Sequence, residues 1–255
     1  MADHSSIEWT EATWNPTTGC DRISAGCDFC YALTMAKRLK SMGAAKYQRD
    51  GDPRTSGPGF GVTLHEDALT APLRWKRPRT VFVNSMSDLF HARVPVSFVQ
   101  RVFEVMDATP QHTYQILTKR AHRLARIASS LPWPNNVWIG VSVEDATQTS
   151  RVDHLRTVPA AVRFISAEPL LGPLDALDLT GIDWVIAGGE SGARARPMAA
   201  DWVRSLRDQC AAADVAFFLK QTGVVLARQW GLSGKGHNID EFPEDLRVRQ
   251  YPAAA

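Results

Sequence analysis

Short runs of β-branched and aromatic residues recur along this chain, and stretches with helical spacing of their apolar positions lie between them. The runs that predict strands are residues 80–83, 113–117, 137–141, 162–165, 184–187 and 216–219. The stretches that predict helices are residues 96–108, 120–129, 146–157 and 199–213. Such alternation with short joins is typical of a parallel sheet with helices packed outside it. The pattern predicts an α/β fold: a partial or near-complete parallel (β/α) barrel of about six to seven strands, TIM-like.

One further strand is predicted at Ile7–Trp9, shortly before three closely spaced cysteines. The chain has 255 residues, a length that one barrel domain routinely reaches. We therefore expect a single domain over residues 1–255, with a cysteine loop over residues 14–32 and a C-terminal extension over about residues 223–255.

Polar residues follow most of the predicted strands directly. In a parallel barrel the carboxyl ends of the strands share one rim, and this rim carries the active site. Each of these residues taken alone also fits a helix cap or a solvated turn. Six polar strand ends on one rim favour a binding site. The residues concerned include Asn84, Ser85, Asp88, Lys119, Arg120, Ser142, Glu144, Ser166, Glu168, Glu190 and Lys220.

Charge changes the picture only locally, because the formal net charge is +2. Residues 1–128 hold 17 Lys and Arg against 12 Asp and Glu, and the excess gathers in residues 74–79 and 119–126. Both clusters suit phosphate groups, and both also fit a solvated surface. No apolar run approaches the length needed to cross a bilayer, and the first residues lack the features of a secretory signal. We expect a cytoplasmic protein with no membrane partner.

Three of the four cysteines, Cys20, Cys27 and Cys30, fall within eleven residues. In a reducing compartment such crowding indicates a metal or redox site more than disulfides. Three thiolates are an incomplete set for zinc or for a four-iron cluster. The site therefore leaves one metal position open, or a distant histidine such as His65 or His91 completes a zinc site. Cys210 lies in a helical pattern and is expected to be a core thiol.

Several segments of the chain resemble those of one protein superfamily. The radical S-adenosylmethionine superfamily has a three-cysteine loop after the first strand of a partial barrel, with an aromatic residue before the last cysteine, as Phe29 is here. Its usual cysteine spacing is three and two residues, whereas this chain has six and two. The sequence looks closest to a phage- and bacteria-borne family that is found beside three-Cys-motif partner proteins. The segments that carry the resemblance are 14–16, 19–20, 26–32, 84–90, 115–120, 140–144, 166–170, 188–192, 218–221 and 239–243.

This resemblance implies a chemistry and a set of roles. Cys20, Cys27 and Cys30 would bind a four-iron four-sulfur cluster, whose open iron would chelate S-adenosylmethionine. An electron from a flavodoxin or ferredoxin would then release a 5′-deoxyadenosyl radical. The implied cofactor-binding residues are Asn84, Ser85, Asp88, Ser142 and Glu144. The expected substrate-binding residues are Lys119, Arg120, Glu168, Glu190 and Lys220.

The substrate class and two other interpretations stay open at this point. The neighbouring basic residues Lys119 and Arg120 favour a nucleotide or nucleic-acid substrate, unless they pair with Glu144 and Glu168 to organise the rim. The first alternative is a non-catalytic, zinc-stabilised nucleic-acid-binding barrel, which the basic first half and the eight tryptophans support. The second is a degenerate barrel that has lost its cluster. No catalytic residue is identified by sequence.

Overall fold

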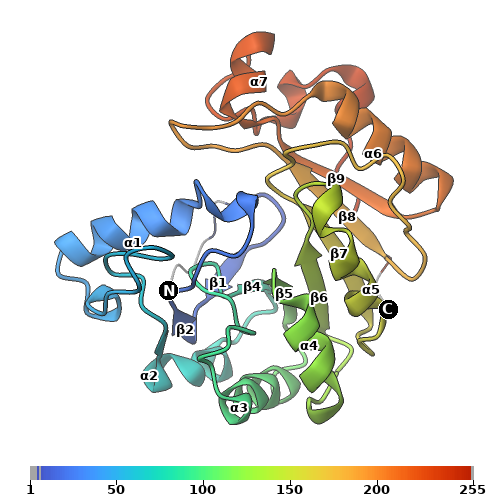
Figure 1. Cartoon of the computed structure of the whole chain (residues 1–255). Coiled ribbons are helices and arrows are strands. Elements are labelled where there is room, and N and C mark those ends of the chain that lie inside the picture. Colours follow the sequence, from blue (N-terminus) through green and yellow to red (C-terminus); the bar gives the residue numbers. More distant parts are fainter. Residues whose placement is uncertain (1–4, 6, 254–255) are drawn as a thin grey trace.

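The computed structural model describes residue 5 and residues 7–253, and its centre is a curled sheet of parallel strands. Seven strands follow one another in the order β1-β4-β5-β6-β7-β8-β9, and every neighbouring pair is parallel. The predicted partial parallel barrel is confirmed as a half-barrel (Figure 1). The strands are β1 (Ala12–Trp14), β4 (Thr80–Val83), β5 (Thr113–Thr118), β6 (Val137–Ser142), β7 (Val162–Ala167), β8 (Trp184–Gly188) and β9 (Ala216–Gln221).

A small antiparallel ribbon stands beside this sheet, formed by β2 (Thr17–Thr18) and β3 (Thr63–Leu64). The α-helices are α1 (Tyr31–Ser41), α2 (Glu66–Leu69), α3 (Val96–Asp107), α4 (Ala121–Ile127), α5 (Ser150–Arg156), α6 (Ala200–Ala212) and α7 (Gly223–Trp230). The 3₁₀ turns are η1 (Ala25–Cys27), η2 (Ala45–Tyr47), η3 (Ala71–Arg74), η4 (Ala128–Ser130), η5 (Ala146–Gln148), η6 (Ile239–Glu241) and η7 (Glu244–Leu246). None of the helices in the described residues is long and apolar enough to cross a membrane.

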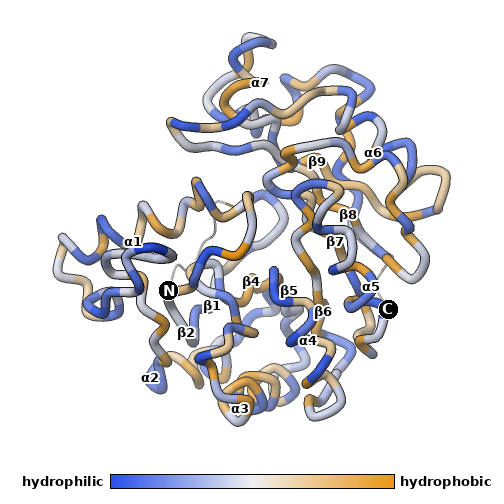
Figure 2. Tube along the Cα trace, in the orientation of Figure 1, coloured by the Kyte–Doolittle hydropathy of each residue, from blue (hydrophilic) through white to orange (hydrophobic). Residues whose placement is uncertain are grey.

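The four predicted helices correspond to α3, α4, α5 and α6, which lie on the outer face of the curled sheet (Figure 1). Their apolar faces and the outward side chains of the strands form the largest core cluster. Figure 2 shows hydrophobic residues along the strands and hydrophilic residues at many of the loops. The hydrophobic pattern predicted these helices because each of them buries one face against the sheet.

The predicted first strand at Ile7–Trp9 is wrong, since the first strand is Ala12–Trp14, which pairs with β4. Residues 7–9 form a turn, in which the Thr10 amide donates to the Ile7 carbonyl over 3.2 Å. The turn places the Trp9 indole against the ring of Phe82, 4.7 Å away between centroids. Burial of Trp9 inside the half-barrel, with 3% of its surface exposed, therefore produced the apolar signal that resembled a strand.

The concave side of the sheet is filled by a second, mainly aromatic cluster. Phe164 and Trp184 pair across β7 and β8, and their rings lie 5.6 Å apart. Gly140 on β6 is opposite Phe164, and a methyl group at Gly140 would lie 2.4 Å from the Phe164 ring. Aromatic packing thus closes the lower lumen. Gln115 on β5, in register with Phe82 and Trp138, is a buried polar residue within the same layer. The cluster consists of Trp9, Phe82, Phe164, Trp184, Ile186 and Phe218.

The C-terminal tail covers the free edge of β9. The Gln250 amide donates to the Phe217 carbonyl over 2.8 Å, and the Trp184 indole donates to the Gln250 carbonyl over 2.9 Å. Tyr251 packs on Trp184 with ring centroids 5.3 Å apart. The tail therefore satisfies backbone groups that an open edge strand would expose.

We expect Gly140→Ala to lower the free energy of unfolding by about 1–3 kcal/mol, because the new methyl group must displace the buried Phe164 ring. Gly192→Ala is the matched control, since a methyl group there meets no atom within 4 Å. Denaturant unfolding followed by fluorescence measures both. Equal stability of the two variants would contradict the packing described for the lumen.

Candidate functional site at the carboxyl ends of the strands

The cysteine loop (residues 14–32) lies against the segment that follows β4. Gly19 has a φ of +86°, and a side chain there would lie 2.4 Å from the backbone of Gly61. The Gly19 amide donates to the Met86 carbonyl over 2.9 Å, and its carbonyl accepts the Ser87 hydroxyl over 2.7 Å. Glycine is therefore required immediately before Cys20, because two backbones approach each other closely at this point.

Cys20, Cys27 and Cys30 are free thiols, all half-buried. Burial raises the pKa of Cys20 to about 12, and the nearby Asp88 carboxylate and Cys27 add to the shift. Burial also raises the pKa of Cys30, with a further contribution from Cys27. The thiols of Cys20 and Cys30 therefore resist ionisation until a metal neutralises them, because metal ligation deprotonates a thiol. Their donor chemistry therefore fits an iron–sulfur cluster.

The two histidines of the zinc alternative are engaged away from the thiols. His65 Nε2 lies 2.8 Å from the Thr18 hydroxyl. His91 Nε2 lies 3.0 Å from Asp21 Oδ2, and its Nδ1 accepts the Arg93 amide over 3.1 Å. Among the described residues, no three His, Cys, Asp or Glu side chains converge on one ion position. Both histidines therefore have partners other than the three thiols.

Glu144 joins the cysteine loop to the barrel. Its carboxylate is fully buried and accepts the Ser24 hydroxyl over 2.6 Å. Lys119 Nζ lies 2.9 Å from Oε1, and Arg151 Nη1 lies 2.7 Å from Oε2. Burial alone would raise the pKa of Glu144, but the two cations and the Ser24 hydroxyl outweigh it and hold this pKa below its ordinary value. Glu144 is thus a charged group enclosed by partners.

Asp88 and Arg120 form a second connection beside Cys20. Asp88 Oδ1 accepts the Thr118 hydroxyl over 2.7 Å, and Oδ2 accepts the Lys119 amide over 3.1 Å. Arg120 Nη2 donates to Cys20 Sγ over 3.6 Å and to the Asp21 carbonyl over 3.1 Å. The sequence predicted that residues 88 and 120 belong to one rim, but it did not predict that the guanidinium contacts a thiol.

Asn84 and Ser85 lie on the turn after β4 and hold the start of the loop. The Asn84 amide donates to the Thr17 hydroxyl over 2.9 Å, and Asn84 has a φ of +66°. The Asn15 amide donates to the Ser85 hydroxyl over 3.1 Å. Ser142 is buried at the end of β6, in register with Ser166 on β7. These predicted cofactor residues lie along the end of the sheet nearest the cysteine loop.

The predicted substrate residues on the other side of the rim are paired with each other or with the loop. Lys220 Nζ lies 3.0 Å from Glu168 Oε1, and the Ser166 hydroxyl donates to Glu168 Oε2 over 3.2 Å. Arg196 lies 2.6 Å from Glu190 and donates to the Ala25 carbonyl over 2.8 Å. The carboxylate–cation pairs of the rim thus include Glu144 with Lys119, Glu168 with Lys220 and Glu190 with Arg196.

Sequence reasoning missed Arg151 and Arg196, although both support the loop. Arg151 follows Glu144 by seven residues and lies on α5, a spacing that gave no distinct signal. Arg196 and Arg194 belong to the loop after β8, and their guanidinium carbons lie 5.0 and 4.8 Å from the Phe29 ring centroid. The sequence signal available for this cation–π contact was a pair of arginines, two residues apart, that follows the Gly-Gly-Glu segment at the end of a predicted strand.

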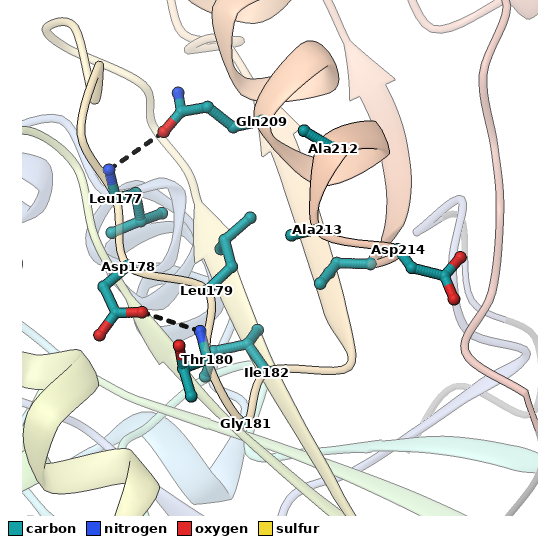
Figure 3. Close-up of a pocket in the computed structure, with 11 residues that line it drawn as sticks. Leu177, Asp178, Leu179, Thr180, Gly181, Ile182, Gln209, Ala212, Ala213 and Asp214 are labelled. Atoms are coloured by element: carbon teal, nitrogen blue, oxygen red, sulfur yellow. Dashed lines mark hydrogen bonds between the residues drawn. The ribbon is translucent and has the colours of Figure 1, made fainter.

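A surface groove of about 540 Å³ lies elsewhere, between residues 177–182 and residues 212–215 (Figure 3). These segments precede β8 and β9, so the groove is at the amino ends of the strands. It lies at the opposite end of the sheet from the cysteines and is not part of this site.

A family model described as "Protein of unknown function (DUF5131)" matches residues 4–245. No curated protein matches the sequence. Among solved structures, spore photoproduct lyase complexed with dinucleoside spore photoproduct has a TM-score of 0.43 at 12% identity, over 76% of this chain and 59% of that one. A mutant of that lyase with bound AdoMet and the same dinucleoside has a TM-score of 0.48 at 12% identity, over 82% and 63%. The chain thus spans less than two thirds of either structure.

We expect Glu144→Gln to lower the free energy of unfolding by about 3 kcal/mol at neutral pH, because it leaves Lys119 and Arg151 buried without their carboxylate. Since the folded pKa of Glu144 lies below its ordinary value of 4.5, the stabilising charge is complete above that value. This stabilisation is lost as the pH falls through the folded pKa. The difference in free energy of unfolding between wild type and Glu144→Gln must therefore become smaller in acid. Denaturant unfolding at several pH values measures this.

Glu104→Gln, an exposed carboxylate on α3, is the control and is expected to change stability little at any pH. A Glu144→Gln penalty that stays constant from neutral to strongly acid pH would contradict the ionised network.

Proposed function

The chain belongs to the DUF5131 family, and we propose that it is a radical S-adenosylmethionine-type enzyme that holds a four-iron four-sulfur cluster. One observation carries the proposal: three half-buried free thiols lie on a loop at the carboxyl end of a parallel half-barrel. Both candidate histidines have other partners. Three thiolates without a fourth protein ligand leave one iron of a four-iron cluster open.

Under this proposal, Cys20, Cys27 and Cys30 hold the cluster. When bound, the cluster and S-adenosylmethionine supply the one-electron reductive cleavage of a sulfonium, with the electron coming from a flavodoxin or ferredoxin. The protein would position the cofactor and shield it from water. The Phe29 ring on the cysteine loop contacts two arginines, and the aromatic cluster fills the lumen on the side away from the rim.

The residues proposed for S-adenosylmethionine are those at the near end of the rim. Ser142 and Ser166 provide hydroxyl groups at the ends of β6 and β7. Asn84 and Ser85 contribute from the turn after β4, where their side chains also hold the start of the cysteine loop. We propose that Asp88 and Glu144 contribute by fixing the loop, since both carboxylates are enclosed by donors from their own chain.

For the substrate we propose an anionic group, of the nucleotide or nucleic-acid class, gripped at the far end of the rim. Lys119 and Arg120 organise the rim through Glu144 and Cys20. On the later strands Lys220 pairs with Glu168, and Glu190 pairs with Arg196. Arg194 is exposed beside Phe29, where a guanidinium on an aromatic ring suits a phosphate next to a base. A three-Cys-motif partner protein remains a proposal from the sequence.

We expect anaerobically reconstituted protein to hold about four irons and four sulfides with a visible charge-transfer band. Cys20→Ala, Cys27→Ala and Cys30→Ala should each abolish the band, and Cys210→Ala, a buried core thiol, should keep it. Dithionite and S-adenosylmethionine should then yield 5′-deoxyadenosine only in protein with the three cysteines. Stoichiometric zinc without sulfide would instead support the zinc-stabilised barrel and overturn the proposal.

Oligonucleotide binding tests the substrate class. We expect affinity for a short single strand to fall steeply with salt, and Arg194→Gln to weaken binding and reduce the salt slope by about 1, the loss of one phosphate contact. Arg77→Gln is the control, since Arg77 is exposed and precedes β4 at the other end of the sheet. If only Arg77→Gln weakened oligonucleotide binding, the phosphates would bind at the amino ends of the strands. If wild-type protein did not bind the oligonucleotide at low salt, a nucleic-acid substrate would be excluded.

A further inference from the structure

We propose that Arg120 is a positioning residue that raises the reduction potential of the cluster by donating an N–H to the Cys20 sulfur. This inference rests on the proposed function, because it requires a cluster on Cys20. It assigns to one side chain a task that neither the cysteine motif nor the family description names.

The guanidinium is held where it serves this purpose. Nη2 lies 3.6 Å from Cys20 Sγ and donates over 3.1 Å to the carbonyl of Asp21. Nε lies 3.9 Å from Asp88 Oδ2 and has no hydrogen-bond partner, although it is buried. The whole side chain is only 14% exposed. A cation with one fully desolvated N–H is therefore fixed against the sulfur at a considerable desolvation cost.

Its backbone leaves the side chain little freedom. Arg120 lies two residues after the end of β5 and immediately before α4, and its backbone amide donates to the Thr118 hydroxyl over 2.9 Å. The same hydroxyl donates to Asp88 over 2.7 Å. Strand β5, the loop after β4 and the cysteine loop are thus joined through residues 88, 118 and 120, and Arg120 is the member that reaches the thiol.

Electrostatics gives the direction of the effect. A cluster gains one negative charge on reduction, so a nearby cation stabilises the reduced form more than the oxidised form. Hydrogen bonds to the sulfurs act in the same direction, and both raise the potential. Asp88 is the opposing charge on the other side of the guanidinium, and its effect on the potential has the opposite sign. If Arg120 and Asp88 only stabilised the fold, their replacement would not shift the reduction potential in opposite directions.

The experiment is an EPR-monitored redox titration of reconstituted full-length protein. For Arg120→Gln we expect the ratio of reduced to oxidised cluster at a fixed potential to fall about tenfold, a decrease of about 59 mV for one electron. Arg120→Lys retains the charge and should recover part of this loss. Asp88→Asn should shift the potential upward. Arg126→Gln changes an exposed arginine on α4, the helix that follows Arg120; it is the matched control and should titrate like wild type.

Iron and sulfide content and the thermal melt are measured for every variant, so that a loss of cluster is separated from a change in potential. Full cluster content with a wild-type potential in Arg120→Gln overturns the inference alone. If Arg120→Gln does not retain a cluster, the inference is tested with Arg120→Lys and Asp88→Asn. Shifts of the reduction potential in opposite directions support the inference, and unchanged potentials in both variants overturn it. Wild-type protein that takes up no iron and sulfide removes the proposed function and this inference together.

Discussion

Burial of the Glu144 carboxylate is the constraint on which the geometry of the rim depends. A charged group with no exposed surface is tolerated only when its partners replace water, and here the partners come from three separate parts of the chain: Ser24, Lys119 and Arg151. They belong to the cysteine loop, the end of β5 and helix α5. The need to satisfy one carboxylate thus places the thiols relative to the sheet.

Gly26 shows how tightly this placement is specified. A methyl group at Gly26 would lie 2.5 Å from Glu144, so the loop backbone rests directly on the carboxylate. The same internal compensation recurs at Glu168 and Glu190, each of which has a cation within 3.0 Å, and at Asp88, where Arg120 Nε lies 3.9 Å away. Because these charges are compensated internally, a ligand that enters must exchange partners with them. Selectivity between ligands can therefore arise from which carboxylate–cation pair a ligand is able to separate and replace with its own contacts.

Periodicity identified the later strands and the outer helices because these elements bury one face over several residues. It did not identify β1, because the three residues of this strand are all buried and show no alternation of buried and exposed positions. A strand was predicted at residues 7–9 instead, because Trp9 is an apolar residue that is buried by tertiary packing. The rim residues were predictable as a set, since parallel strands end on one side. Their pairing was not, because Arg151, Arg196 and Ser24 meet the predicted acids across 7, 6 and 120 residues through the folded backbone.

The tail that pairs with β9 has a consequence for the order of events in folding. Tyr251 reaches the Glu8 carbonyl over 3.5 Å, a contact that joins residues 243 positions apart, and both segments pack around the aromatic lumen. Local strand–helix units can assemble as the chain leaves the ribosome, but this seam cannot close until residue 251 has emerged. Closure of such distant contacts is slow compared with local folding. Sealing of the lumen is therefore a late step of folding, and it comes after the rim and its cysteine loop have been synthesised.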